Sequence, residues 1–291
     1  MSGPRNDLRA LAVLVAGACI IGFSPILVRL AETGPAAAGF WRLAFAAPIL
    51  WLMAARSADG AGRPSPLTAL AALFFALDLG FWHYGIKYTS VANATVLSNG
   101  APITVVAFAW IFLRQRPGGL FLAALAGAIA GAVVMALAKS GGAPVNQPLG
   151  DALSLSTALW YGLYVLATAQ ARKTESTGRV MLWATLLGAP LMALAALLLG
   201  EDFTPATWAG WAACVGLGVM HATGQGAVAW SLGRLPTATA SVVMLIQPVV
   251  AAGLGWVLFG EHITPLQGLG AVVLLAGVVL AQWAGRKESL S

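Results

Sequence analysis

The sequence has little charge and little cysteine. Only 9% of its 291 residues are Asp, Glu, Lys or Arg, against roughly 25% in a typical soluble domain. Its two cysteines, Cys19 and Cys214, lie in apolar segments without the CxxC spacing of a redox or zinc motif. We expect both to be small buried hydrophobic residues. These shortages exclude an ordinary soluble domain and a disulfide scaffold.

Motifs for catalysis, cofactors and nucleic acid are also missing. There is no HExxH, no GxSxG, no Walker lysine and no pair of acids on one helix, so we expect no enzyme and no catalytic residues. Haem ligation is disfavoured because His83 and His221 occupy non-equivalent positions of the two halves and His262 lies in a loop. We therefore expect no cofactor and no metal. The basic residues form no stripe with interleaved aromatics, so no nucleic-acid partner is expected.

Long apolar runs fill most of the chain. Apolar residues make up 59%, and the mean hydropathy is +0.83. A helix needs about 20 apolar residues to cross a bilayer, and the short loops leave no room for a soluble domain. We predict an all-α, multi-pass protein of the bacterial inner membrane with the lipid bilayer as its surroundings. Its ten expected spans are 8–30, 36–55, 66–86, 91–113, 119–138, 148–171, 179–199, 206–231, 237–259 and 265–284.

The sequence repeats itself with a shift of 146 residues. Residues 92–121 match 238–267, so that Pro102 falls on Pro248 and Trp110 on Trp256. A unit with an odd number of spans must enter the membrane from opposite sides in its two copies. We therefore predict two inverted five-helix repeats, residues 1–145 and 146–291. Inverted repeats are the architecture by which carriers alternate access to a central site.

Basic residues test the orientation independently. With the N-terminus inside, the inner segments hold twelve Lys or Arg and the outer segments hold three, namely Arg29, Lys87 and Lys139. This asymmetry predicts that both termini are cytoplasmic. The net charge of +6 and the pI near 9.8 then report orientation and attraction to anionic lipid.

Small-residue patterns indicate close helix packing. Gly127 and Gly131 form a GxxxG motif, and Gly270 and Gly277 lie on one face of the last span. Such faces serve packing within the chain or across a dimer. We expect packing within the chain, with a monomer or a weak homodimer as the assembly.

Several short motifs carry a resemblance to a known family. They are Phe40-Trp41-Arg42-Leu43, Gln247-Pro248, Leu258-Phe259-Gly260-Glu261 and Gln267-Gly268. With the five-plus-five plan they resemble the EamA-type drug/metabolite transporter (DMT) superfamily, and within it the aromatic amino acid exporters called YddG. The resemblance spans essentially the whole chain and implies efflux of amino acids, aromatic and other apolar ones included. The first repeat departs from the pattern, because Gln115 stands where the second has Glu261.

The sixth span carries a stripe of rings and hydroxyls. At about 100° per residue, one third of its circumference holds five side chains. The stripe occupies the middle of the helix, whereas a lipid-facing aromatic belt would gather at the ends. It suits a cavity that holds an apolar or aromatic solute, with plain packing as the alternative. The residues are Thr157, Trp160, Tyr161, Tyr164 and Thr168.

Two other spans place polar side chains one turn apart. His221 and Gln225 share a face of the eighth, and Asn99 shares one with Thr95 and Pro102 in the fourth. Polar groups at this depth face protein or water rather than lipid. They are candidates for substrate contact, with hydrogen bonds between helices as the alternative.

The third span carries Asp78, Trp82, His83 and Tyr84. Asp78 is the one carboxylate deep in a span, which makes it a candidate for cation, amine or proton handling. A structural ion pair with Arg42, which lies inside the second span, is the alternative. Arg42 could instead hold a substrate carboxylate. We count Trp82, Tyr84 and His83 as candidate substrate contacts, with a structural donor as the alternative for the histidine.

Prolines inside the spans are candidate hinges, because each frees carbonyl groups that neighbouring helices must satisfy. The repeat mates Pro102 and Pro248 stand where rocking gates are expected. The sequence thus predicts a secondary transporter that exports small metabolites, most of all amino acids, by alternating access around a central cavity. A broad drug or metabolite exporter and a channel are the alternatives.

Overall fold

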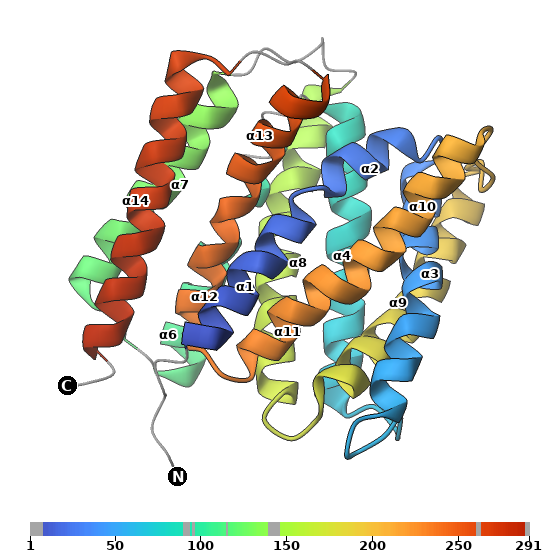
Figure 1. The fold of residues 1–291 in the computed structure, drawn as a ribbon, viewed down its shortest axis with the longest axis horizontal. Coiled ribbons are helices and arrows are strands. Elements are labelled where there is room, and N and C mark those ends of the chain that lie inside the picture. Colours follow the sequence, from blue (N-terminus) through green and yellow to red (C-terminus); the bar gives the residue numbers. More distant parts are fainter. Residues whose placement is uncertain are drawn as a thin grey trace.

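A computed structural model describes residues 8–89, 94, 97–114, 116–138, 146–259 and 263–288 (Figure 1). Every regular element in these ranges is helical, which confirms the all-α class. The first half holds α1 (Leu8–Ile21), α2 (Ser24–Leu30), α3 (Pro35–Ala55), α4 (Pro66–Tyr88), α6 (Ala101–Leu113) and α7 (Gly119–Leu137). The second holds α8 (Gln147–Ala171), α9 (Thr177–Leu198), α10 (Trp208–Met220), η1 (His221–Gln225), α11 (Gly226–Leu232), α12 (Thr237–Val243), η2 (Met244–Ile246), α13 (Gln247–Phe259) and α14 (Pro265–Glu288).

Capping residues set where many of these helices begin. The side-chain oxygen of Ser65 accepts from the backbone N–H of Thr68 at 3.2 Å, ahead of α4. Ser176 and Thr207 cap α9 and α10 in the same way. An N-cap of this kind contributes about 1 kcal/mol, because it satisfies a backbone donor that has no partner within the helix. Local sequence therefore sets where these three helices begin.

Seven helical segments in the described ranges are long and apolar enough to cross a membrane: 8–30, 35–55, 66–88, 147–171, 177–198, 237–258 and 265–284. Two shorter apolar helices are Ala101–Phe112 and Gly119–Met135. α10, η1 and α11 follow one another without a break, with a π-helical turn in the middle. The chain is thus a multi-pass membrane protein, and the number of ten spans stays a prediction.

Close backbone contact joins α7 to α14. A Cβ added at Gly131 would lie 2.4 Å from the backbone nitrogen of Leu274, and one at Gly277 would lie 2.5 Å from that of Ala128. No atom lies within 4 Å of a Cβ built at Gly127. The glycine face of these two helices is therefore used within the chain, by Gly131 and Gly277 but not by Gly127.

The end of the bundle at which α1 begins and α14 ends also carries the turns after α3, α8 and α11 (Figure 1). Polar contacts join two of these turns. Asp59 forms an ion pair with Arg179 at 3.6 Å and accepts from the backbone N–H of Ser176 at 2.8 Å. Glu175 accepts from the hydroxyls of Ser65 and Thr68. These contacts tie the start of α4 to the start of α9.

A second polar cluster joins the same helices at the opposite end. Glu201, in the α9–α10 connection, accepts from the backbone N–H of Ala37 at 2.9 Å and from the hydroxyl of Tyr84. The indole of Trp41 donates to the Phe203 carbonyl at 2.6 Å. The α3–α4 pair is therefore fastened to α9 at both ends and to the α9–α10 connection at the second end, and α10 packs on α3, so that these helices form one block.

Candidate functional site

A cavity of about 230 Å³ lies between the two halves of the chain. Its walls come from the α1–α2 junction and α2, the middle of α3, the second half of α4, the start of α6, the end of α7, the middle of α8, and η1, η2, α12, α13 and α14. Most lining residues are apolar, as in small-molecule sites generally. The volume is below the roughly 300–1,000 Å³ of sites for drug-sized ligands. The space therefore fits a small solute.

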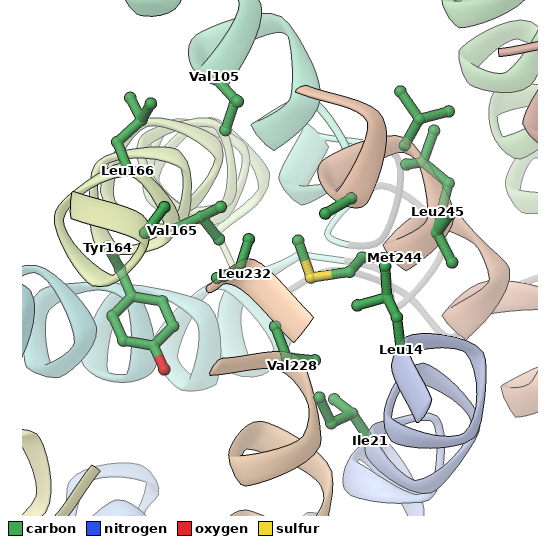
Figure 2. Packing of buried hydrophobic residues seen from close by; sticks show 14 of the residues in the cluster. Leu14, Ile21, Val105, Tyr164, Val165, Leu166, Val228, Leu232, Met244 and Leu245 are labelled. Atoms are coloured by element: carbon green, nitrogen blue, oxygen red, sulfur yellow. The ribbon is translucent and has the colours of Figure 1, made fainter. Parts of the chain in front are cut away.

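One end of the cavity is blocked by apolar side chains. Leu14, Val228, Leu232 and Met244 converge beside Val165 (Figure 2). The five residues come from four helical segments, α1, α8, α11 and η2. They lie toward the end of the bundle at which α1 begins. All five are buried in the largest hydrophobic cluster of the molecule. We call these five residues the apolar plug.

The other end of the cavity reaches the surface. Arg29, an exposed residue near the end of α2, lines it together with Ile86 from the last turn of α4 and Gln267 from the first turn of α14. Access is thus from the end opposite the start of α1. We call this exposed end the mouth. At the other end of the described lining lies Met244, which also belongs to the apolar plug.

Two buried side chains of opposite charge face this cavity, Arg42 and Asp78. The guanidinium donates to the Ser24 hydroxyl at 3.2 Å and lies 5.6 Å from the centre of the Phe75 ring. It interacts electrostatically with Asp78, but the described residues contain no direct ion pair between the two. Within the described ranges, the Nε–H of Arg42 has no hydrogen-bond acceptor.

Amide and hydroxyl groups complete the polar part of the lining. Tyr161 donates from its hydroxyl to the sulfur of Met244 at 3.3 Å and also contacts the side chains of Gln225 and Gln247. The Oε1 atom of Gln225 and the Nδ2 atom of Asn99 are buried without a partner among the described residues. Both side chains line the cavity. Free donors and free acceptors therefore face the same space.

The stripe of the sixth span divides between the cavity and the packing around it. Thr157 and Tyr161 line the cavity. Trp160 instead packs against Phe74 and Phe81 of α4, with ring centres 6.3 and 6.2 Å apart. Tyr164 is fully buried against Phe75 at 4.8 Å, and Thr168 is also buried outside the lining.

Three more candidate residues lie outside the lining. The ring nitrogen Nδ1 of His83 is 2.6 Å from the Pro35 carbonyl and must donate to it, because a carbonyl only accepts. His221 shares a hydrogen bond of 3.1 Å between its Nε2 and the Thr185 hydroxyl. Tyr84 donates to Glu201 near the mouth end. In this conformation, each connects helices around the cavity.

The two repeat prolines, Pro102 and Pro248, both line the cavity. Each stands in the first turn of a helix, after a local break in the helical path. Residues 99–100 form a turn ahead of α6, and Met244–Ile246 form a 3-10 turn ahead of α13. These breaks are related by the 146-residue shift of the sequence repeat. Thr95, Gln115, Glu261 and His262 lie outside the described residues.

Several lining residues were not predicted as site residues. Ser24, Ser98, Ser241, Gln247 and Gln267 are polar and face the cavity. Ser24 and Gln247 directly precede a proline, and Ser98 lies four residues before Pro102. For these three, the position before a proline was the available signal in the sequence. Within the described ranges, no group of three His, Cys, Asp or Glu side chains is placed to hold a metal ion.

The sequence model of the EamA-like transporter family matches the chain twice, over residues 8–137 and 148–283. Three curated relatives are exporters. The threonine/homoserine exporter RhtA of Escherichia coli K12 is 26% identical, over 76% of this chain and 73% of RhtA. The pseudopaline exporter CntI of Pseudomonas aeruginosa is 25% identical, over 94% of this chain and 96% of CntI. A probable terminal-alkyne amino-acid exporter of Streptantibioticus cattleyicolor is 28% identical, over 72% and 70%.

A solved crystal structure shares the fold. It superposes with a TM-score of 0.81, covering 96% of this chain and 98% of that one at 18% sequence identity. The arrangement of helices described above is therefore an established one.

Proposed function

We propose that this chain, which belongs to the EamA-like transporter family, exports small metabolites, chiefly amino acids, from the cytoplasm across a bacterial inner membrane. The relatives named above are transporters rather than enzymes. Two of them carry amino acids according to their names. The observation that carries the proposal is the cavity: residues of both halves line it, its mouth is exposed at Arg29, and its described lining reaches Met244 of the apolar plug.

The way the helices are joined supports alternating access. The Asp59, Glu175 and Glu201 contacts fasten α3 and α4 to α9 at both ends, and α10 packs on α3. The helices that bear the breaks, α6 and α12–α13, lie outside this block and meet the cavity at Pro102 and Pro248. Movement of these helices and α1 against the block would open the plug and close the mouth, as in rocking carriers.

An inverted five-plus-five arrangement, with both termini in the cytoplasm, is part of the proposal. Its support is that α7 packs on α14 and that these two helices are related by the 146-residue shift. The double match of the family model agrees with two repeats. In this orientation the cavity mouth faces outward, and the plug is the inner gate.

The lining favours small apolar and aromatic amino acids over bulky drugs. Trp82 and Tyr161 offer aromatic surface inside the cavity, and a buried aromatic pair contributes about 1 kcal/mol beyond its buried area. The volume of about 230 Å³ is small for a drug-sized ligand. A broad drug exporter would need a larger space than this conformation offers. A channel would need a continuous path, which the plug interrupts.

Flux into proteoliposomes tests the proposal. Purified protein should take up labelled phenylalanine with saturation, and Tyr161→Ala should weaken the apparent affinity several-fold more for phenylalanine than for threonine. Trp160→Ala is the matched control, because its ring lies outside the lining. Uptake repeated with an imposed pH gradient decides whether transport is coupled to protons. Linear, unsaturable flux would indicate a channel, and no amino acid flux would refute the proposed function.

A further inference from the structure

Four polar groups in the cavity wall lack the partners that buried groups normally have. They are the Nε–H of Arg42, the carboxylate of Asp78, the Nδ2 amide of Asn99 and the Oε1 oxygen of Gln225. Among the described residues, none of the three neutral or cationic atoms has a hydrogen-bond partner. The Asp78 carboxylate interacts electrostatically with Arg42, Tyr161 and Tyr164 but forms no ion pair with Arg42 among these residues. All four side chains line one cavity. Buried polar groups are almost always satisfied, so a shared set of exceptions points to a ligand.

We propose that these four groups bind the main-chain part of a zwitterionic α-amino acid: Arg42 and Asn99 hold its carboxylate, and Asp78 and Gln225 hold its ammonium group. The two donors match an anion, and the two acceptors match a cation. The inference rests on the proposed function, since it names the chemical group by which that cavity recognises its cargo.

The separation of Arg42 from Asp78 is part of the argument. A structural ion pair would place the two charges in direct contact, because a buried charge without a partner is costly. Here they interact without touching. The Ser24 hydroxyl and the face of Phe75 hold the guanidinium from other sides. The remaining Nε–H is therefore left free for an acceptor that enters the cavity.

Charge balance then gives the site its selectivity. An amino acid brings one negative and one positive group, and each meets its opposite in the wall. A carboxylic acid without the amine leaves Asp78 unpaired, and an amine without the carboxylate leaves Arg42 unpaired. Leaving one partner of a buried pair alone is strongly unfavourable. The apolar remainder of the wall, with Trp82 and Tyr161, receives the side chain of the amino acid.

Competition binding to the purified full-length protein tests this assignment. The probe is labelled L-phenylalanine, displaced by unlabelled L-phenylalanine, 3-phenylpropionate, which lacks the amine, or 2-phenylethylamine, which lacks the carboxylate. With the unmodified protein, we expect both analogues to compete at least about tenfold more weakly than phenylalanine.

Two substitutions should then reverse the selectivity in opposite directions. Asp78→Asn should weaken phenylalanine and strengthen 3-phenylpropionate, and Arg42→Gln should strengthen 2-phenylethylamine instead. A loss of folded protein cannot produce such a charge-matched gain of binding. Asp202→Asn and Arg56→Gln make the same changes of charge at exposed positions and should alter none of the three affinities.

The outcomes separate the inference from the proposed function. If phenylalanine binds and the analogues compete equally well before and after the substitutions, the zwitterion site is refuted while export stands. If binding is selective as described but proteoliposomes show no flux, export is refuted while the site stands. If phenylalanine neither binds nor moves, and neither do threonine and the other amino acids, both are refuted.

Discussion

Leu14 offers the sharpest test of the inner gate. Its side chain is 0% exposed and packs in the apolar plug next to Met244 (Figure 2). Truncating a buried leucine to alanine costs roughly 2–5 kcal/mol. If the plug residues separate when the inner gate opens, the substitution destabilises only the conformation in which the plug is closed. Even 2 kcal/mol would then shift the balance between the two states by about 30-fold.

The labelling rate of a single cysteine inside the cavity measures this shift between the two states. In a background without Cys19 and Cys214, Thr157→Cys places a thiol in the lining. Leu14→Ala should raise the rate at which an impermeant thiol reagent labels it from the cytoplasmic side, and lower the rate from the outside. The matched control is Leu50→Ala, which also truncates a leucine with 0% exposure but in a separate core cluster.

The control decides the interpretation. Leu50→Ala should lower the melting temperature about as much as Leu14→Ala and leave the ratio of inner to outer labelling unchanged. Equal changes of that ratio in both variants would mean that labelling reports general loosening of the protein. An unchanged ratio in Leu14→Ala would refute the plug as a gate.

Three further predictions concern topology and stability. Gly60 and Gly200 have φ near +60° and open space around them. In intact cells, an impermeant thiol reagent should label Gly200→Cys from outside but not Gly60→Cys. Equal labelling of the two variants would contradict the orientation. Gly131→Ala should destabilise the protein by roughly 1–3 kcal/mol, because the added methyl group clashes with α14. Gly127→Ala, whose methyl group would contact no other residue, should be neutral or stabilising in a thermal melt. Similar melting temperatures of the two variants would contradict the α7–α14 contact. Burial alone would raise the pKa of Asp59, but hydrogen bonds from Ser176 and the nearby guanidinium of Arg179 hold that pKa below its ordinary value of 3.8. The contribution of Asp59 to stability is therefore present above about pH 4 and is lost as the pH falls through the lowered pKa. Asp59→Asn should remove this part of the acid dependence of the melting temperature, and an unchanged dependence would contradict the prediction.

The sequence predicted the helical class well because bilayer physics leaves few choices. Runs of apolar residues about 20 long must be helices in hydrocarbon, where no water satisfies the backbone. The same reasoning placed Asn99, Tyr161 and Gln225 at buried polar positions, and all three line the cavity. Helix periodicity shows which residues share a face of a helix, but it does not show which neighbouring helix each of those residues contacts. Trp160 and Tyr164 therefore fell on the flanks of the stripe, against α4, rather than in the cavity.

Other features depended on contacts between distant segments. The prolines were predicted to interrupt spans, and the structure places Pro102 and Pro248 in first turns after a local break. Ser24 and Gln247 each directly precede a proline, but that position alone does not reveal the cavity they face, because the cavity forms only when distant helices pack together. The relation of Arg42 to Asp78 also needed the structure. Sequence left a direct pair and a substrate contact open, and the two side chains face one cavity without a direct ion pair among the described residues.

Counterflow in proteoliposomes tests the central claim most directly. Vesicles loaded with unlabelled phenylalanine should accumulate labelled phenylalanine faster than empty vesicles, because a carrier that alternates around one cavity exchanges its cargo on each return. Leucine inside should stimulate in the same way, and 3-phenylpropionate should not. Equal uptake by loaded and empty vesicles, with flux proportional to concentration, would contradict alternating access around this cavity.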